Sequence, residues 1–323
     1  MATNTFRRGL TNDARGKLGA LAASSTENWW KDLLALWGPS GTGKAERPLR
    51  LAVRDNYLNF YLRGQSVARV GFSPQGEPYI DVHVKYAFEN GEGQTYARMT
   101  DGEVVHGASG GRAAYLGAAS LWEWMARAAR WETAEKAEVD RVVADNSAVI
   151  DLEMGLPAHG EQASSLRMDL IALEPTSSGS QIVFWEAKRV TDARLRSNGD
   201  EPEVMEKQLK PYKDYLAVEG HRDAVLEAYA ATCSLLCDFA QWTSIKGKPV
   251  VLDRLVSAAA KNPSLLSVDP QPRLVIFGTE EQLCEPTWNR HQEKLANLRV
   301  PMITITTDAY RLDAPIGSAG APA

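Results

Sequence analysis

The chain has 323 residues, with 36 lysines and arginines against 41 aspartates and glutamates, and its formal charge is −5. This acidic balance excludes a polybasic protein that binds nucleic acid through its overall field. We expect no transmembrane helix and no secretory leader, because apolar runs of the required length are absent. The three cysteines form no zinc or disulfide pattern and are expected to be buried free thiols, which indicates a cytoplasmic protein.

The first part of the chain is rich in predicted strands. Residues 1–26 are small and polar and are expected to be frayed, whereas an apolar stripe predicts a helix over 27–37. Aromatic and β-branched runs then predict strands over 57–62, 66–72, 79–88 and 95–100. We therefore expect a β-rich module with a leading helix over residues 1–112. Three basic side chains, Arg54, Arg63 and Lys85, are expected to be exposed. Together with the neighbouring Tyr57, Tyr61 and Tyr86 they are candidates for recognising a protein or nucleic-acid partner.

Helical patterns and strands then alternate along a larger second unit, over residues 113–313. Helices are predicted over 113–145, 204–218 and 224–242, and strands over 148–154, 167–173, 181–190, 273–278 and 302–307. This order predicts the α/β class, with a mixed sheet flanked by helices. The small residues of 314–323 predict a disordered tail.

One predicted hairpin brings charged side chains together. If its turn spans Thr176 to Gly179, Asp169 lies opposite Glu186, with Cβ atoms roughly 5 Å apart. Alternation along the second strand places Lys188 on the same face as Glu186. The spacing therefore predicts two carboxylates and one ammonium at the end of an otherwise apolar sheet.

This cluster favours metal-dependent chemistry on a phosphate. Two carboxylates at this separation repel each other unless a cation lies between them. Magnesium takes oxygen ligands from one or two carboxylates together with substrate phosphate. A neighbouring lysine can position or activate the attacking water. We therefore expect Asp169 and Glu186 to bind Mg²⁺, with Mn²⁺ as a substitute, and Lys188 to assist phosphodiester hydrolysis.

The same residues resemble the signature of the PD-(D/E)XK nuclease superfamily. Asp169, Glu186 and Lys188 match its acidic residue and Glu-x-Lys pair, with Met168 where the superfamily name has proline. Gln208 and Tyr212 resemble the Q-x-x-x-Y helix motif of the RecB-like branch. The resemblance covers about residues 135–216. It implies a restriction-endonuclease-like fold, and a helix whose glutamine and tyrosine orient the lysine or contact the DNA backbone.

Further side chains are candidates for a supporting role. The superfamily often adds an acid from the preceding helix, and either Glu135 or Glu138 fits that position. Glu153 is a candidate because a carboxylate within an apolar strand needs a partner, although a strand-end salt bridge would also supply one. Contacts to nucleic acid are expected from basic residues after the motif: Arg189, Arg194, Arg196 and Lys210.

The resulting hypothesis is a divalent-metal-dependent endonuclease or exonuclease, acting on DNA in a defence, mobile-element or repair setting. The first alternative is a non-catalytic module that retains the fold and binds nucleic acid or protein. A second alternative is a serine hydrolase, because GASGG places Ser109 in a G-x-S-x-G pattern. A homodimer is compatible with all three hypotheses.

Overall fold

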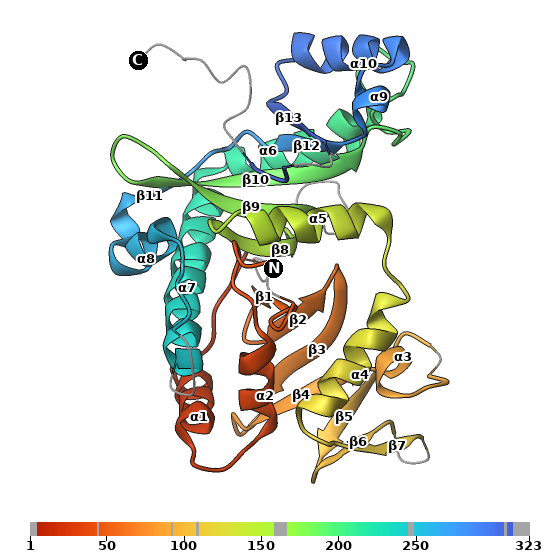
Figure 1. Cartoon of the computed structure of the whole chain (residues 1–323). Coiled ribbons are helices and arrows are strands. Elements are labelled where there is room, and N and C mark those ends of the chain that lie inside the picture. The colour runs from red at the N-terminus through yellow and green to blue at the C-terminus, as the bar shows by residue number, and fades with distance from the viewer. Residues whose placement is uncertain are drawn as a thin grey trace.

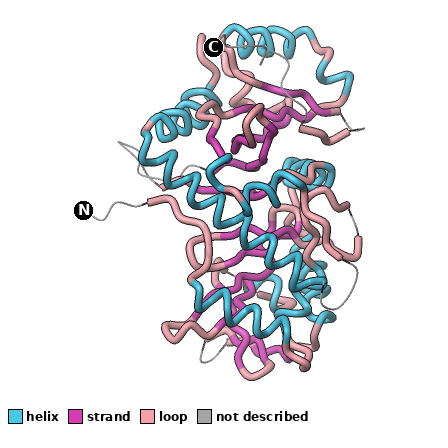
Figure 2. Tube along the Cα trace, turned by 90° about the vertical axis from the view of Figure 1, so that its left-hand side faces the viewer, coloured by secondary structure: helices cyan, strands magenta, loops and turns pink. Residues whose placement is uncertain are grey.

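The computed structural model describes residues 5–43, 45–91, 93–107, 110–157, 167–244, 249–306 and 309–312. It contains two β-sheets, which lie one above the other along the long axis of the molecule (Figure 1). The same arrangement is visible after a quarter turn (Figure 2). Ser109 and the predicted tail at 314–323 lie outside the described residues. Within the described part of the chain, no helix combines the length and apolar character needed to cross a membrane.

The first sheet is an antiparallel meander of seven strands in chain order. It includes the four predicted strand regions, together with short strands that the sequence patterns did not predict. Residues Val84–Ala87, predicted as the end of a strand, form the short helix α3 instead. The strands are β1 (Arg50–Val53), β2 (Leu58–Leu62), β3 (Gln65–Phe72), β4 (Pro78–His83), β5 (Tyr96–Thr100), β6 (Glu103–Val105) and β7 (Arg112–Ala114).

Helices differ from the sequence-based prediction in two places. Residues 12–23, expected to be frayed, form helix α1 (Asn12–Ala23), because Thr11 caps its start and Leu18 is buried. The single helix predicted over 113–145 is two helices, because Thr133 accepts a hydrogen bond from Lys136 N and begins a new one. The remaining helices of this half are α2 (Trp29–Leu36) and α4 (Ala118–Ala129), whereas α5 (Ala134–Asp145) packs against the second sheet.

The second sheet is mixed, as predicted, and its strand order is β13-β12-β10-β9-β8, with β11 beside β10. The three strands that come first in the chain, β8, β9 and β10, form an antiparallel meander. Strand β12 pairs in parallel with β10, and β13 in parallel with β12. The mixed α/β class is therefore confirmed. The strands are β8 (Val149–Gly155), β9 (Arg167–Pro175), β10 (Ser180–Arg189), β11 (Leu266–Val268), β12 (Arg273–Phe277) and β13 (Met302–Ile305).

Helices flank the second sheet, and the longest also reaches the first sheet. Helix α7 runs beside both sheets (Figure 1) and packs against α1, α2 and β8. The helices of this half are the π-helical turn Met205–Leu209, α6 (Lys210–Ala217), α7 (Glu219–Ser244), α8 (Arg254–Lys261), the 3₁₀ turn Pro263–Leu265, α9 (Glu280–Leu283) and α10 (Pro286–Asn297).

One hydrophobic cluster connects the two sheets. Trp30 on α2, Phe60 on β2 and Phe239 on α7 pack together in edge-to-face contacts, with ring centroids 5.7–6.1 Å apart. Ile182 and Phe184, on the predicted catalytic strand, belong to the same cluster. The two halves of the chain therefore share a core. Cys233 is buried in it, but Cys284 is exposed, so the expectation of three buried thiols was wrong.

A buried carboxylate also joins the two halves. Asp151 on β8 is 1% exposed and accepts hydrogen bonds from Arg54 Nη1 at 2.6 Å and from Tyr229 Oη at 3.1 Å. Arg8 Nε lies 3.3 Å from the same carboxylate. Arg54 was expected to be exposed, but it is buried, because its partner Asp151 lies on the other sheet.

Removing this carboxylate should destabilise the whole molecule. Asp151→Ala leaves Arg54 buried without its counter-charge, so we expect a loss of about 3–5 kcal/mol in the free energy of unfolding. Tyr229→Phe removes one hydrogen bond and should cost about 1 kcal/mol. Urea unfolding measures both values, with the exposed Asp214→Asn as control, and an unchanged midpoint for Asp151→Ala would contradict the account.

Candidate active site

The hairpin of β9 and β10 has the predicted register. Leu170 pairs with Trp185 and Ile171 with Phe184, so Asp169 and Glu186 are the next residues on the two strands. The Oδ2 atom of Asp169 accepts a hydrogen bond of 2.8 Å from the backbone N–H of Ala187. The Asp169 carboxylate is therefore held between the positions of Glu186 and Lys188.

Glu186 and Lys188 are almost completely buried, each with 2% exposure. The Lys188 ammonium forms an ion pair with Glu186 Oε1 and donates a second hydrogen bond, of 2.8 Å, to the carbonyl of Ala187. Burying this pair is costly, because both charges lose their hydration. The strand thus fixes an ammonium and a carboxylate in a site from which most water is excluded.

One oxygen of the buried glutamate has no hydrogen-bond partner among the described residues. The Oε1 atom of Glu186 accepts from Lys188 and from the side-chain amide of Gln208, but Oε2 is buried and unpaired. The amide oxygen of Gln208 is also buried and unpaired. Unsatisfied buried oxygens are rare, and hard cations prefer carboxylate and amide oxygens as ligands. The donor set therefore fits a divalent cation such as Mg²⁺.

The local electrostatics also favour a bound cation. Burial raises the pKa of Asp169 well above its usual value, and the charge of Glu186 raises it further against the opposing effect of Lys188. Burial likewise raises the pKa of Glu186. Within the described residues, no group of three or more His, Cys, Asp or Glu side chains is placed to hold a metal. A cation here would depend on two carboxylates and neutral oxygens.

The two residues of the predicted helix motif contact two different strands. Gln208 lies in the π-helical turn and reaches Glu186 on β10. Tyr212 lies in α6, is buried, and donates a hydrogen bond of 3.1 Å to the carbonyl of Met154 on β8. π-Helical turns often occur at functional sites. This segment therefore covers the cluster and positions β10 relative to β8.

Both acidic candidates on α5 lie near the site, in different surroundings. Glu138 lies 3.6 Å from Arg189 Nε, and burial raises its pKa in spite of that positive charge. Glu135 acts on the cluster itself, because its charge contributes to the raised pKa of Glu186. Both acids therefore lie within electrostatic range of β10, the strand that bears Glu186.

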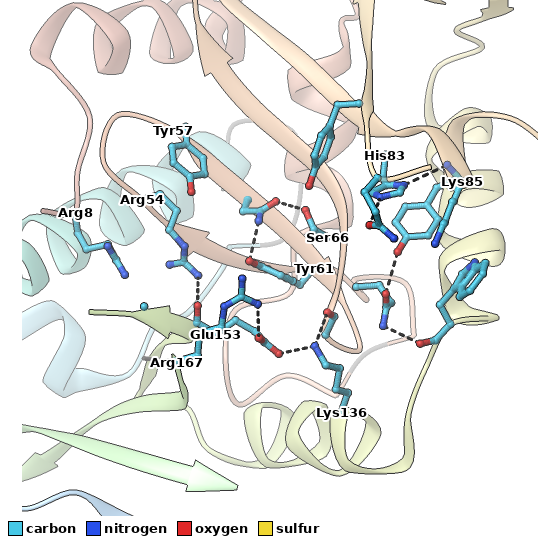
Figure 3. A pocket seen from close by; sticks show the side chains of 18 residues that line it. Arg8, Arg54, Tyr57, Tyr61, Ser66, His83, Lys85, Lys136, Glu153 and Arg167 are labelled. Atoms are coloured by element: carbon cyan, nitrogen blue, oxygen red, sulfur yellow. Dashed lines mark hydrogen bonds and ion pairs between the residues drawn. The ribbon is translucent and has the colours of Figure 1, made fainter. Parts of the chain in front are cut away.

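Glu153 has a different environment from the other candidates. Its backbone adopts a left-handed conformation with φ of 51°, which is uncommon for a residue with a side chain. Its carboxylate pairs with Lys136 Nζ at 2.8 Å and lies 3.9 Å from Arg167, facing a separate pocket (Figure 3). The salt bridge anticipated as the alternative for Glu153 is thus present.

Most of the basic candidates are engaged with acids. Arg194 forms a 2.6 Å ion pair with Asp192, and Arg196 lies 3.4 Å from Glu285. Lys210 is exposed at the start of α6. The segment after the motif therefore presents little uncompensated positive charge.

The sequence patterns missed a group of basic residues elsewhere. Arg8, Lys136 and Arg167 line the pocket that Glu153 faces, together with Lys85 and the predicted tyrosines. Of these three residues, only Arg167 shares a strand with a predicted catalytic residue, because it begins the strand that carries Asp169. Arg63, predicted to belong to the same surface, pairs with Glu132 instead.

The raised pKa of Asp169 predicts how stability depends on pH. Such a group binds its proton more tightly in the folded state, so its stabilising contribution exists at low pH and is lost as pH rises through the folded pKa. Asp169→Asn should therefore unfold at a higher temperature than the wild type at neutral pH, and the difference should vanish below about pH 4. Each pKa unit corresponds to about 1.4 kcal/mol.

Thermal unfolding across pH in metal-free buffer measures this effect, with Asp214→Asn as the exposed control. A destabilised Asp169→Asn protein at neutral pH would show that the carboxylate is stabilising and would contradict the prediction.

Comparisons of the chain with protein-family models, with curated proteins and with solved structures found no match.

Proposed function

We propose that the protein is a divalent-metal-dependent nuclease that hydrolyses phosphodiester bonds in DNA. The observation that carries the proposal is the buried Glu186, with one unpaired oxygen, beside Asp169 and Lys188. A buried carboxylate with an unsatisfied oxygen destabilises a fold unless a ligand completes it. Perturbed carboxylates of this kind are concentrated at functional sites.

The topology supports a restriction-endonuclease-like fold as the specific architecture. Strands β8, β9 and β10 form the antiparallel meander that bears Asp169 and Glu186, and later strands extend the sheet in parallel. Helix α5 precedes the meander, and α6 with the π-helical turn follows it. This order agrees with the fold implied by the resemblance to PD-(D/E)XK nucleases.

Asp169 and Glu186 would hold Mg²⁺, or Mn²⁺ as a substitute, with the amide oxygen of Gln208 beside them. The bound ion would supply Lewis-acid stabilisation of the phosphate and a lowered pKa for the attacking water. It would also neutralise the repulsion between the two carboxylates.

The remaining chemistry belongs to side chains of the chain. Lys188 Nζ is held by Glu186 and by the Ala187 carbonyl. From this position the ammonium orients the attacking water and stabilises the charge that develops on the phosphate. Gln208 and Tyr212 act as positioning residues, because they fix Glu186 and the covering helix.

Lys188→Ala tests the proposed chemistry. Cleavage of plasmid and single-stranded DNA in Mg²⁺ should fall at least about a hundredfold, the usual contribution of a group that acts on the attacking water. The exposed Lys261→Ala is the matched control and should cleave like the wild type. Thermal unfolding verifies that the Lys188 variant is folded.

Undiminished cleavage by folded Lys188→Ala would remove Lys188 from the mechanism. No cleavage by the wild-type protein, with Mg²⁺ or Mn²⁺ and on DNA or RNA, would favour the non-catalytic binding module.

Glu186→Gln tests the proposed metal ligand independently of activity. Loss of one anionic ligand should weaken Mg²⁺ binding by at least about tenfold in calorimetry. The exposed Glu219→Gln is the control and should bind Mg²⁺ like the wild type. Equal affinity in the wild type and Glu186→Gln would place the ion elsewhere.

A further inference from the structure

A polar pocket of about 630 Å³ lies between the first sheet and the β8–β9 edge of the second (Figure 3). Its volume falls within the range of about 300–1,000 Å³ typical of small-molecule sites. Leu58 and Phe60 on β2 point into the core, whereas Asn59 and Tyr61 of the same strand, and Tyr57 just before it, line the pocket. The alternation of the strand therefore gives this face of the first sheet a polar, aromatic surface.

The charge of the pocket is opposite to that of the whole chain. Five cationic side chains line it, and Glu153 is the one carboxylate among the lining residues. Asp151, which is not a lining residue, forms ion pairs with two of these cations, Arg8 and Arg54. Subtracting the charges of Glu153 and Asp151 from the five cations leaves three positive charges at the pocket. A concave positive site in a protein of charge −5 favours an anionic ligand. The five cations are Arg8, Arg54, Lys85, Lys136 and Arg167.

Aromatic side chains stand at the edge of the pocket beside one of these cations. Trp131 is 52% exposed and Tyr96 is 42% exposed, so both rings leave much of their surface open to a ligand. Lys85 Nζ lies 4.2 Å from the centre of the Trp131 ring. Exposed rings of this kind offer stacking surfaces for nucleobases, whereas a ligand of purely ionic character would not need them.

Hydrogen bonds hold the pocket wall in place before any ligand arrives. Gln65 accepts from Tyr86 Oη and donates to the carbonyl of Trp131, each at 2.9 Å. Asn59 donates to Tyr61 Oη at 2.8 Å. These contacts fix the orientation of two aromatic rings and of the Trp131 backbone, so little ordering is required on binding.

We propose that this pocket binds a nucleotide, with phosphate on the cationic side chains and the base against Trp131 and Tyr96. The inference does not depend on the nuclease proposal, because the lining residues exclude Asp169, Glu186 and Lys188. Either a nucleic-acid strand or a free nucleotide has the required chemistry. A strand has the advantage of position, since Arg167 precedes Asp169 by two residues on β9.

Calorimetry on the full chain in EDTA tests the proposal without cleavage. The probes are the four deoxynucleoside 5′-monophosphates, ATP and GTP, a short single-stranded oligonucleotide of mixed sequence, and inorganic phosphate. Lys85→Ala, Arg167→Ala and Trp131→Ala should each weaken nucleotide binding by about tenfold, the effect of about 1.4 kcal/mol. Lys261→Ala and Trp122→Ala are matched exposed controls and should bind like the wild type.

The outcomes distinguish a nucleic-acid strand from a free nucleotide as the ligand. Binding of the oligonucleotide alone supports a strand as the source, and binding of mononucleotides or triphosphates supports a free nucleotide. No binding of any nucleotide, binding that the three pocket variants leave unchanged, or equal affinity for inorganic phosphate overturns the proposal. Pocket binding without metal-dependent cleavage would support this inference while refuting the nuclease, and the converse result would do the opposite.

Discussion

The carboxylate of Asp151 is buried between the two sheets, and the position of the cationic pocket depends on it. Arg54 comes directly after β1, Tyr229 lies in α7, and each donates to this one group on β8. A charge at this depth is tolerated only with its partners in place. The first sheet is therefore held in one position against β8. The cationic pocket lies at this junction, and Arg167, two residues before Asp169 on β9, is among its lining residues.

The Asp169–Glu186–Lys188 cluster opposes stability in the way that functional sites often do. Two carboxylates with raised pKa values and an unpaired oxygen are unfavourable in the absence of a ligand. The surrounding structure nevertheless holds them, because β10 is paired with β9 on one side and with β12 on the other. The π-helical turn then covers the cluster through Gln208. Rigid surroundings thus maintain an arrangement that the side chains alone would not adopt.

The local part of this structure could be predicted from the sequence, and the long-range part could not. The register of Asp169 and Glu186 follows from a short turn and from strand alternation, which need only neighbouring residues. Helix α1 escaped prediction because its small residues carry a weak apolar pattern, and its burial depends on distant α7. Arg54 was expected at the surface because its partner, Asp151, lies almost one hundred positions later. The pocket was hidden for the same reason, since its walls come from separate segments.

The turn from Thr176 to Gly179 has a consequence for natural variation in this hairpin. Its length sets which residue faces which, so inserting one residue would rotate one carboxylate to the opposite side of the sheet. Inserting two would preserve the facing sides and shift only the pairing. At Gly179 a Cβ atom would approach the carbonyl oxygen of Leu265 to 2.2 Å, so this end of the turn is packed closely and does not accept a larger residue. Whether the number of residues in this turn is odd or even therefore determines whether the two carboxylates face the same side of the sheet.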